Sequence, residues 1–150
     1  MKLIGALVVF ALAATSLAAD PQHSQIVARV SLINRTVSEN ATLYTPSEDG
    51  LFRISAYGET ISSATNGGVT VSFNWKDDAT SHSGLQSKTV FGFDVTSDAF
   101  QNYGWTTLII RGKAGSPISS QITLSLPLGG SATYSVFFVV ERLSSASTEE

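Results

Sequence analysis

The 150-residue sequence predicts an all-β protein, an antiparallel β-sandwich of about eight strands. Short segments rich in β-branched and aromatic residues recur along the chain. Several of them alternate apolar and polar side chains with the period of two that a half-buried strand requires. Clusters of Gly, Pro, Ser and Asn separate these segments at spacings typical of a sandwich. Beyond the N-terminal segment, no long stretch has the apolar 3.6-residue period of a helix.

Residues 1–19 have the pattern of a secretory signal peptide. Lys2 precedes an apolar run at residues 3–14, and small residues follow up to Ala18 and Ala19. This order of basic start, apolar run and small-residue exit is what signal peptidase recognises. The run is shorter than the roughly 20 residues of a membrane span. We therefore expect cleavage after Ala18 or Ala19, a secreted or periplasmic chain, and no stable membrane insertion of the mature protein.

Three of the predicted strands alternate most regularly, at residues 69–76, 90–95 and 120–126. Each has one apolar face and one polar or small-residue face, as in a strand that contacts the core on one side. The core is predicted to draw on these three strands and on the last strand of the chain. The predicted core side chains are Val71, Phe73, Trp75, Phe91, Phe93, Ile122, Leu124, Val136 and Phe138.

The last predicted strand, residues 134–143, is apolar on both faces. Val136 and Phe138 share one face, whereas Phe137 and Val139 share the other. A strand of this kind is covered on both sides, by the core on one and by a loop, a second sheet or another subunit on the other. We expect Phe137 and Val139 to form an oligomer contact if Val136 and Phe138 face the core.

The remaining strands are predicted at residues 25–34, 41–45, 50–57 and 104–111. Turn-forming clusters separate the strands at residues 46–50, 65–68, 112–117 and 127–130. Residues 97–102 suit a single helical turn. Residues 144–150 are polar, without a large apolar side chain, and are expected to be a disordered tail. These features predict one domain, residues 20–143.

Residues 43–55 carry a resemblance to a known family. An aromatic-containing strand enters a turn with Pro46 and Gly50, and another aromatic-containing strand leaves it. This segment resembles part of the jelly-roll heads of complement subunits and tumour necrosis factor, and residues 134–140 are similar to their last strand. Small bacterial and phage proteins of unknown role carry similar segments. The resemblance implies a jelly roll whose heads pack around a threefold axis, hence a homotrimer. The sequence departs from the family in having no collagen-like or coiled-coil stalk, and an immunoglobulin-like sandwich is the alternative topology.

The composition argues against catalysis and metal binding. The only histidines are His23 and His82, and Cys is absent, so neither a catalytic triad nor a zinc site has its usual residues. Asp77 and Asp78 form one of two acidic pairs in turns, without the alternating carboxylates of a calcium loop. No spacing brings together the carboxylate pair of a glycoside hydrolase, for which Glu59, Asp94 and Glu141 are the candidates. We expect no enzyme, no cofactor and no metal site.

Charge and aromatic residues define the possible partners. Without Lys2 the chain has eight basic against twelve acidic residues, a net charge near −4 with no basic patch for nucleic acid. Tyr103 and Trp105 begin a strand at the predicted rim and are the candidate ligand-binding residues, because such rings stack on sugars. Asn34 and Asn40 match the glycosylation sequon, which matters only in a eukaryotic host.

These observations favour an exported, non-enzymatic structural, adhesion or assembly module that acts through its surface as a homo-oligomer. The alternative is a carbohydrate- or ligand-binding module at the sandwich rim, with a glycan or a cell-surface partner. An enzyme with an unrecognised carboxylate pair is the third reading.

Overall fold

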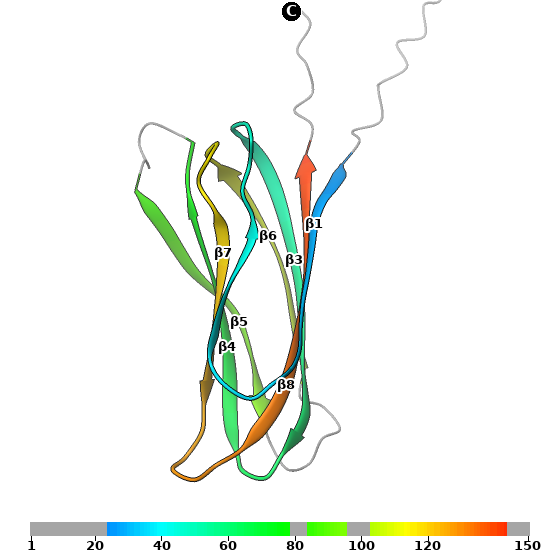
Figure 1. Ribbon diagram of the computed structural model, residues 1–150, viewed down its shortest axis with the longest axis vertical. Helices are drawn as coiled ribbons and strands as arrows, with labels where there is room; N and C mark the ends of the chain where they lie inside the picture. The colour runs from blue at the N-terminus through cyan, green and yellow to red at the C-terminus, as the bar shows by residue number, and fades with distance from the viewer. Residues whose placement is uncertain (1–23, 79–83, 96–102, 144–150) are drawn as a thin grey trace, which may run out of the picture.

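The structure is a computed structural model that describes residues 24–78, 84–95 and 103–143 (Figure 1). The regular secondary structure of these residues is eight β-strands, one for each predicted strand. They are β1 (Gln25–Arg35), β2 (Glu39–Tyr44), β3 (Gly50–Ser63), β4 (Gly67–Lys76), β5 (Leu85–Val95), β6 (Tyr103–Gly112), β7 (Ile118–Ser125) and β8 (Ala132–Leu143). The expected signal peptide, the helical turn at residues 97–102 and the C-terminal tail lie outside the described residues. Within those ranges, no helix has the length and hydropathy needed to cross a membrane.

The strands form two antiparallel four-stranded sheets. The first sheet has the order β1-β8-β3-β6 and the second the order β2-β7-β4-β5. Only β4 and β5 are neighbours both in sequence and in a sheet. Each of the other connections leads to a strand of the opposite sheet. An immunoglobulin-like sandwich instead pairs several consecutive strands. The two-sheet, eight-stranded order is that of a jelly roll, and the jelly-roll prediction is confirmed.

The core lies between the two sheets. Phe73 of the second sheet and Phe138 of the first meet edge to face there, with ring centroids 6.0 Å apart. Six predicted core residues are buried: Val71, Phe73, Phe93, Ile122, Val136 and Phe138. Three others, Trp75, Phe91 and Leu124, are only partly buried and pack at the margin of the core. Trp75 and Leu124 are the penultimate residues of their strands, and Phe91 belongs to the edge strand β5.

The turn that carries the family resemblance is held by the loop between β6 and β7. The Gly115 amide donates to the Pro46 carbonyl at 2.8 Å, and the Ala114 amide donates to Asp49 Oδ1 at 2.7 Å. Gly115 has a φ of 71°, a left-handed conformation that glycine adopts without strain. These bonds tie the loops at one end of the sandwich together.

Candidate functional site: an aromatic row on the first sheet

The first sheet has an outer face whose residues are set by strand alternation. On β3, Phe52, Ile54 and Ala56 point into the core, so Tyr57 lies on the opposite, outer face. On β8 the buried residues alternate with Phe137 and Val139, which are partly buried. Both predicted contact residues therefore lie on the outer face, and the strand phase on which that prediction depended is confirmed.

Three aromatic residues lie side by side across this face. Tyr57 pairs with Phe137 of β8 on one side and with Trp105 of β6 on the other. Directly opposed residues in antiparallel strands have Cβ atoms about 4.5–5.5 Å apart, so these three residues are neighbours on the outer face. We call Phe137, Tyr57 and Trp105, with the adjacent Tyr103, the aromatic row.

Tyr57 is the residue that connects the row. Its ring lies 6.3 Å from that of Phe137 and 6.4 Å from that of Tyr103, with interplanar angles of 27° and 26°. Its hydroxyl donates to Glu59 Oε2 at 3.1 Å, and burial is the main reason why the pKa of this phenol is raised. The candidate ligand residue Tyr103 and the candidate contact residue Phe137 thus belong to one surface, which sequence analysis had treated as two.

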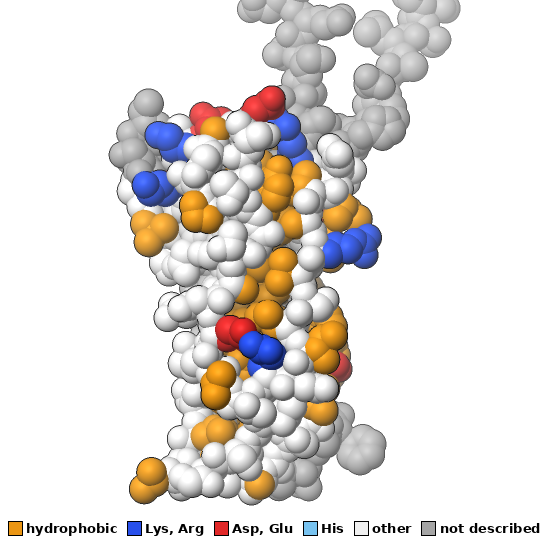
Figure 2. Space-filling view, viewed as in Figure 1, with side chains coloured by type: hydrophobic (Ala, Val, Ile, Leu, Met, Phe, Trp, Pro, Cys, Tyr) orange, Lys and Arg blue, Asp and Glu red, His pale blue; other side chains and the backbone are white. Residues whose placement is uncertain are grey.

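The aromatic row is open to solvent. Trp105 is 71% exposed and Tyr103 58%, and Ile109 further along β6 is also exposed. Of the eleven exposed large hydrophobic residues among those described, eight belong to strands of the first sheet. Figure 2 shows hydrophobic side chains along the side of the molecule where β1 and β3 lie, and a mostly white surface, which is backbone and other side chains, on the side of β7. Apolar exposure is therefore concentrated on one sheet.

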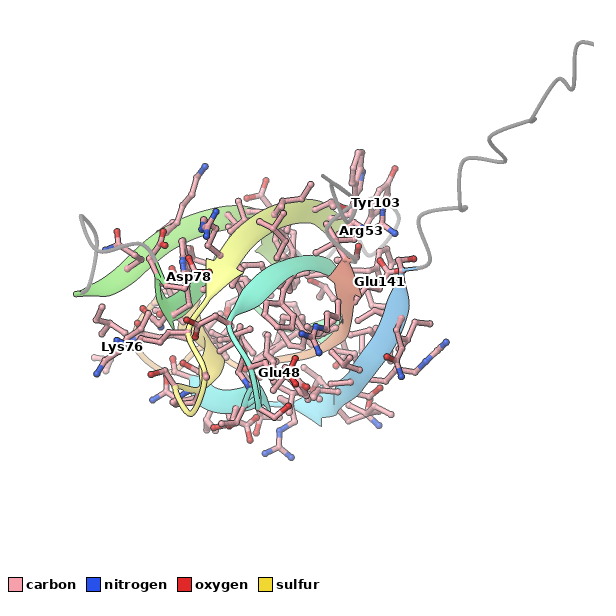
Figure 3. All side chains as sticks on the ribbon, turned by 90° about the horizontal axis from the view of Figure 1, so that it is seen from above. Glu48, Arg53, Lys76, Asp78, Tyr103 and Glu141 are labelled. Carbon is pink, nitrogen blue, oxygen red and sulfur yellow. The ribbon has the colours of Figure 1, made fainter. Side chains whose placement is uncertain are left out.

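One cation and one anion of this face, on β3 and β8, neutralise each other. Arg53 of β3 and Glu141 of β8 are opposed in the ladder, and Arg53 Nε donates to Glu141 Oε2 at 2.5 Å. This hydrogen bond lowers the pKa of Glu141. Seen end-on, Arg53, Glu141 and Tyr103 lie on one side of the sandwich, and Lys76 and Asp78 on the other (Figure 3). A partner that covers the aromatic row would therefore bury no unpaired charge at Arg53 or Glu141.

Two of the carboxylates considered for hydrolysis, Glu59 and Glu141, lie far apart. Glu59 lies six residues from Arg53 on β3, and Arg53 is opposite Glu141, which puts the two glutamates roughly 20 Å apart along the sheet. This separation of Glu59 and Glu141 exceeds the roughly 5–10 Å between the carboxyl groups of glycoside hydrolases. Asp94 belongs to β5 of the other sheet, where its main-chain carbonyl accepts from Thr60 Oγ1 at 3.1 Å and its side chain is exposed.

Asp78, considered for metal binding, and Trp75, considered for sugar stacking, make other contacts in the structure. Asp78 accepts from two of the three guanidinium nitrogens of Arg111, Nε at 2.5 Å and Nη2 at 3.1 Å. No cluster of three or more metal-ligating side chains occurs within the described ranges. Trp75 is partly buried against the core rather than exposed, as its strand phase predicts. His23 and His82 lie outside the described residues.

Comparison with known proteins finds no matching family model and no matching curated protein. Similar solved structures include the CBM22-1-GH10 modules of a Clostridium thermocellum xylanase with xylohexaose, at 14% identity and TM-score 0.36 over 85% of this chain and 25% of that one. A CBM22-1 xylan-binding domain from Paenibacillus barcinonensis has 11% identity and TM-score 0.36 over 83% and 92%. Murine APRIL has 14% identity and TM-score 0.36 over 75% and 97%. This chain thus spans a quarter of the xylanase fragment, and the jelly-roll assignment rests on the strand order.

Proposed function

We propose that this protein is a non-enzymatic assembly module that associates with further copies of itself through the aromatic row. The observation that carries the proposal is the register of Phe137, Tyr57 and Trp105 across three strands of an exposed sheet face. Soluble monomers rarely expose large contiguous apolar surfaces, and such surfaces often mark interaction sites. Aromatic residues are enriched at the centres of protein interfaces, from which charged residues are depleted.

The electrostatics of the face suit association with an identical partner. Arg53 and Glu141 pair within each copy, so this pair adds little net repulsion when the faces of different copies meet. Large aromatic side chains bury about 150–250 Å² each and dominate interface energetics. The trimeric state follows from the resemblance to tumour necrosis factor heads, in which apolar flanks pack around a threefold axis.

The test compares two exposed hydrophobic residues on edge strands of opposite sheets. Trp105→Asp places a charge in the aromatic row, whereas Leu85→Asp places one at a residue of similar exposure, 67%, on β5. Light scattering after gel filtration should give a trimer mass for the unmodified protein and for Leu85→Asp, and a monomer with an unchanged melting temperature for Trp105→Asp. A monomeric unmodified protein at high micromolar concentration would refute self-assembly.

A second candidate function is sugar binding at the rim, favoured by the free indole ring of Trp105. Trp105 is the most exposed aromatic residue described and has no ring partner among the described residues. Sugar stacking on this ring would make Trp105→Ala lose retention on a polysaccharide column. Phe137→Asp, a change at the strand-β8 end of the row, would keep it. Loss of retention in both variants would instead mean that the polysaccharide contacts the whole aromatic row.

A further inference from the structure

A second surface with different chemistry lies on the outer face of the second sheet. A hollow of about 420 Å³ opens there, within the range of roughly 300–1,000 Å³ typical of ligand pockets. Its lining residues are Asn40, Asn74, Lys76, Leu85, Pro117, Ser119, Ser120 and Gln121. None of them belongs to the aromatic row, so this surface is independent of the proposed function.

The polar side chains of the hollow are arranged in two neighbouring rows across the sheet. In one row Asn40 of β2 opposes Gln121 of β7, which in turn opposes Ser72 of β4. In the next row Ser119 of β7 opposes Asn74 of β4. Neighbouring strands lie about 4.8 Å apart, so the amide and hydroxyl groups form a regular, closely spaced array on rigid strands.

The amides of this array are available to a ligand. The side chains of Asn40, Asn74 and Gln121 make no hydrogen bond within the described part of the chain. The neighbouring Ser72 hydroxyl, by contrast, pairs with that of Thr89 at 3.0 Å. An unpaired carboxamide offers one acceptor oxygen and two donor hydrogens. Three of them in one hollow can therefore satisfy a ligand whose groups both donate and accept.

The charge and apolar content of the hollow narrow the ligand class. Among the described residues that line it, Lys76 is the only charged one and none carries a carboxylate. Leu85, which is largely exposed, and Pro117 supply an apolar wall against which C–H groups can pack. A phosphate-rich ligand would call for several cations. A sugar matches the site because its hydroxyls donate and accept while its ring presents C–H groups.

We propose that this hollow binds a neutral oligosaccharide. A peptide fits the site less well, because extended peptides are usually bound along an exposed sheet edge through main-chain hydrogen bonds. Most of the described lining of the hollow instead belongs to β7 and β4, the two central strands of the second sheet. Their main-chain groups are already paired on both sides.

The test uses the isotope-labelled mature protein and follows the side-chain amide resonances of Asn40, Asn74 and Gln121 by NMR. The probes are linear hexasaccharides of glucose, xylose, mannose and N-acetylglucosamine, with hexagalacturonate as the charged contrast. At least one neutral hexasaccharide should shift these resonances saturably, and hexagalacturonate should shift them less. No shift with any saccharide overturns the proposal, as does a shift of these resonances by a neutral Ser/Asn-rich decapeptide alone.

Variants then locate the binding. Asn74→Ala and Gln121→Ala should each weaken binding at least tenfold, while Thr70→Ala, on the same face of β4 outside the hollow, should not. Trp105→Asp should bind as the unmodified protein does. If Trp105→Asp abolishes saccharide binding and Asn74→Ala leaves it intact, the saccharide binds at the rim, and the proposed site in the hollow is overturned.

Discussion

Gly58 of β3 packs against the ring of Phe93 of β5 so closely that no side chain fits between them. A Cβ atom on Gly58 would lie 2.5 Å from Cε1 of Phe93. We expect Gly58→Ala to destabilise the fold by about 1–3 kcal/mol, the usual cost of overpacking a core. The control is Gly68→Ala, whose Cβ would meet nothing closer than 3.8 Å. Equal unfolding midpoints in urea for the two variants would contradict this contact.

Phe73 should be among the most costly side chains to remove. It is fully buried and contacts Phe138 across the two sheets, so Phe73→Ala should cost roughly 3–5 kcal/mol in denaturant unfolding. Phe91→Ala is the matched control and should cost less, because Phe91 is only partly buried on an edge strand. A loss below about 1 kcal/mol for Phe73→Ala would mean that the strand phase is wrong there.

The ion pair of Asp78 with Arg111 should make stability depend on pH. The hydrogen bond from Arg111 lowers the pKa of Asp78 below its usual 3.8, so the folded state favours the charged carboxylate. In acid, the carboxylate therefore takes up a proton when the protein unfolds. The contribution of the ion pair to the free energy of unfolding is fully present above about pH 4 and is lost as the pH falls through the lowered pKa. Glu141 beside Arg53 acts in the same direction.

Urea unfolding of Asp78→Asn at pH 7 and at pH 3 measures this contribution. The difference in stability between the two pH values should be smaller in Asp78→Asn than in the unmodified protein. Asp94→Asn should keep the full difference, because Asp94 forms no ion pair among the described residues. An unchanged pH dependence in Asp78→Asn would show that the pair does not contribute.

Removal of metal should leave the fold unchanged. The carboxylate of Asp78, one of the two residues considered for calcium, is already engaged by Arg111. We therefore expect the same melting temperature with and without millimolar EDTA. A large drop on adding EDTA, reversed by calcium, would point to a calcium site at Asp77 and Asp78.

Processing of the N-terminus can be tested on secreted material. The small-residue exit at residues 16–19 predicts a mature chain that starts at Ala19 or Asp20. Intact-mass measurement of protein from the culture medium or periplasm checks this. Retention of Met1 in the exported protein would contradict it.

Strand positions and strand phase could be read from the sequence because both depend on local alternation. Period two alone puts Val136 and Phe138 on one face of the last strand and Phe137 on the other, and the structure confirms that Val136 and Phe138 face the core. Burial depth was less predictable. Trp75 has the phase of a core residue, yet its place near the end of β4 leaves it partly exposed.

The aromatic row could not be predicted, because it depends on pairing between strands far apart in the chain. The sequence predicts only that Tyr57 belongs to a strand, and the structure places it on the outer face, opposite in phase to the buried Phe52 and Ile54. That it lies between Phe137 and Trp105 is a property of register, which no local pattern specifies. The hollow was missed for the same reason, since Asn40, Asn74 and Gln121 come from three strands.

The pairing of β1 with β8 decides how the domain responds to mechanical load. Gln25 opposes Arg142, so the first and last described strands have their outer ends side by side (Figure 1). Hydrogen bonds in an antiparallel ladder run perpendicular to the strands. Tension applied between residues 24 and 143 would therefore load these bonds one after another, as in a zipper, instead of all at once in shear. Tethered through both ends, the domain would yield by peeling β1 from the sheet at low force, before the core between the sheets opened.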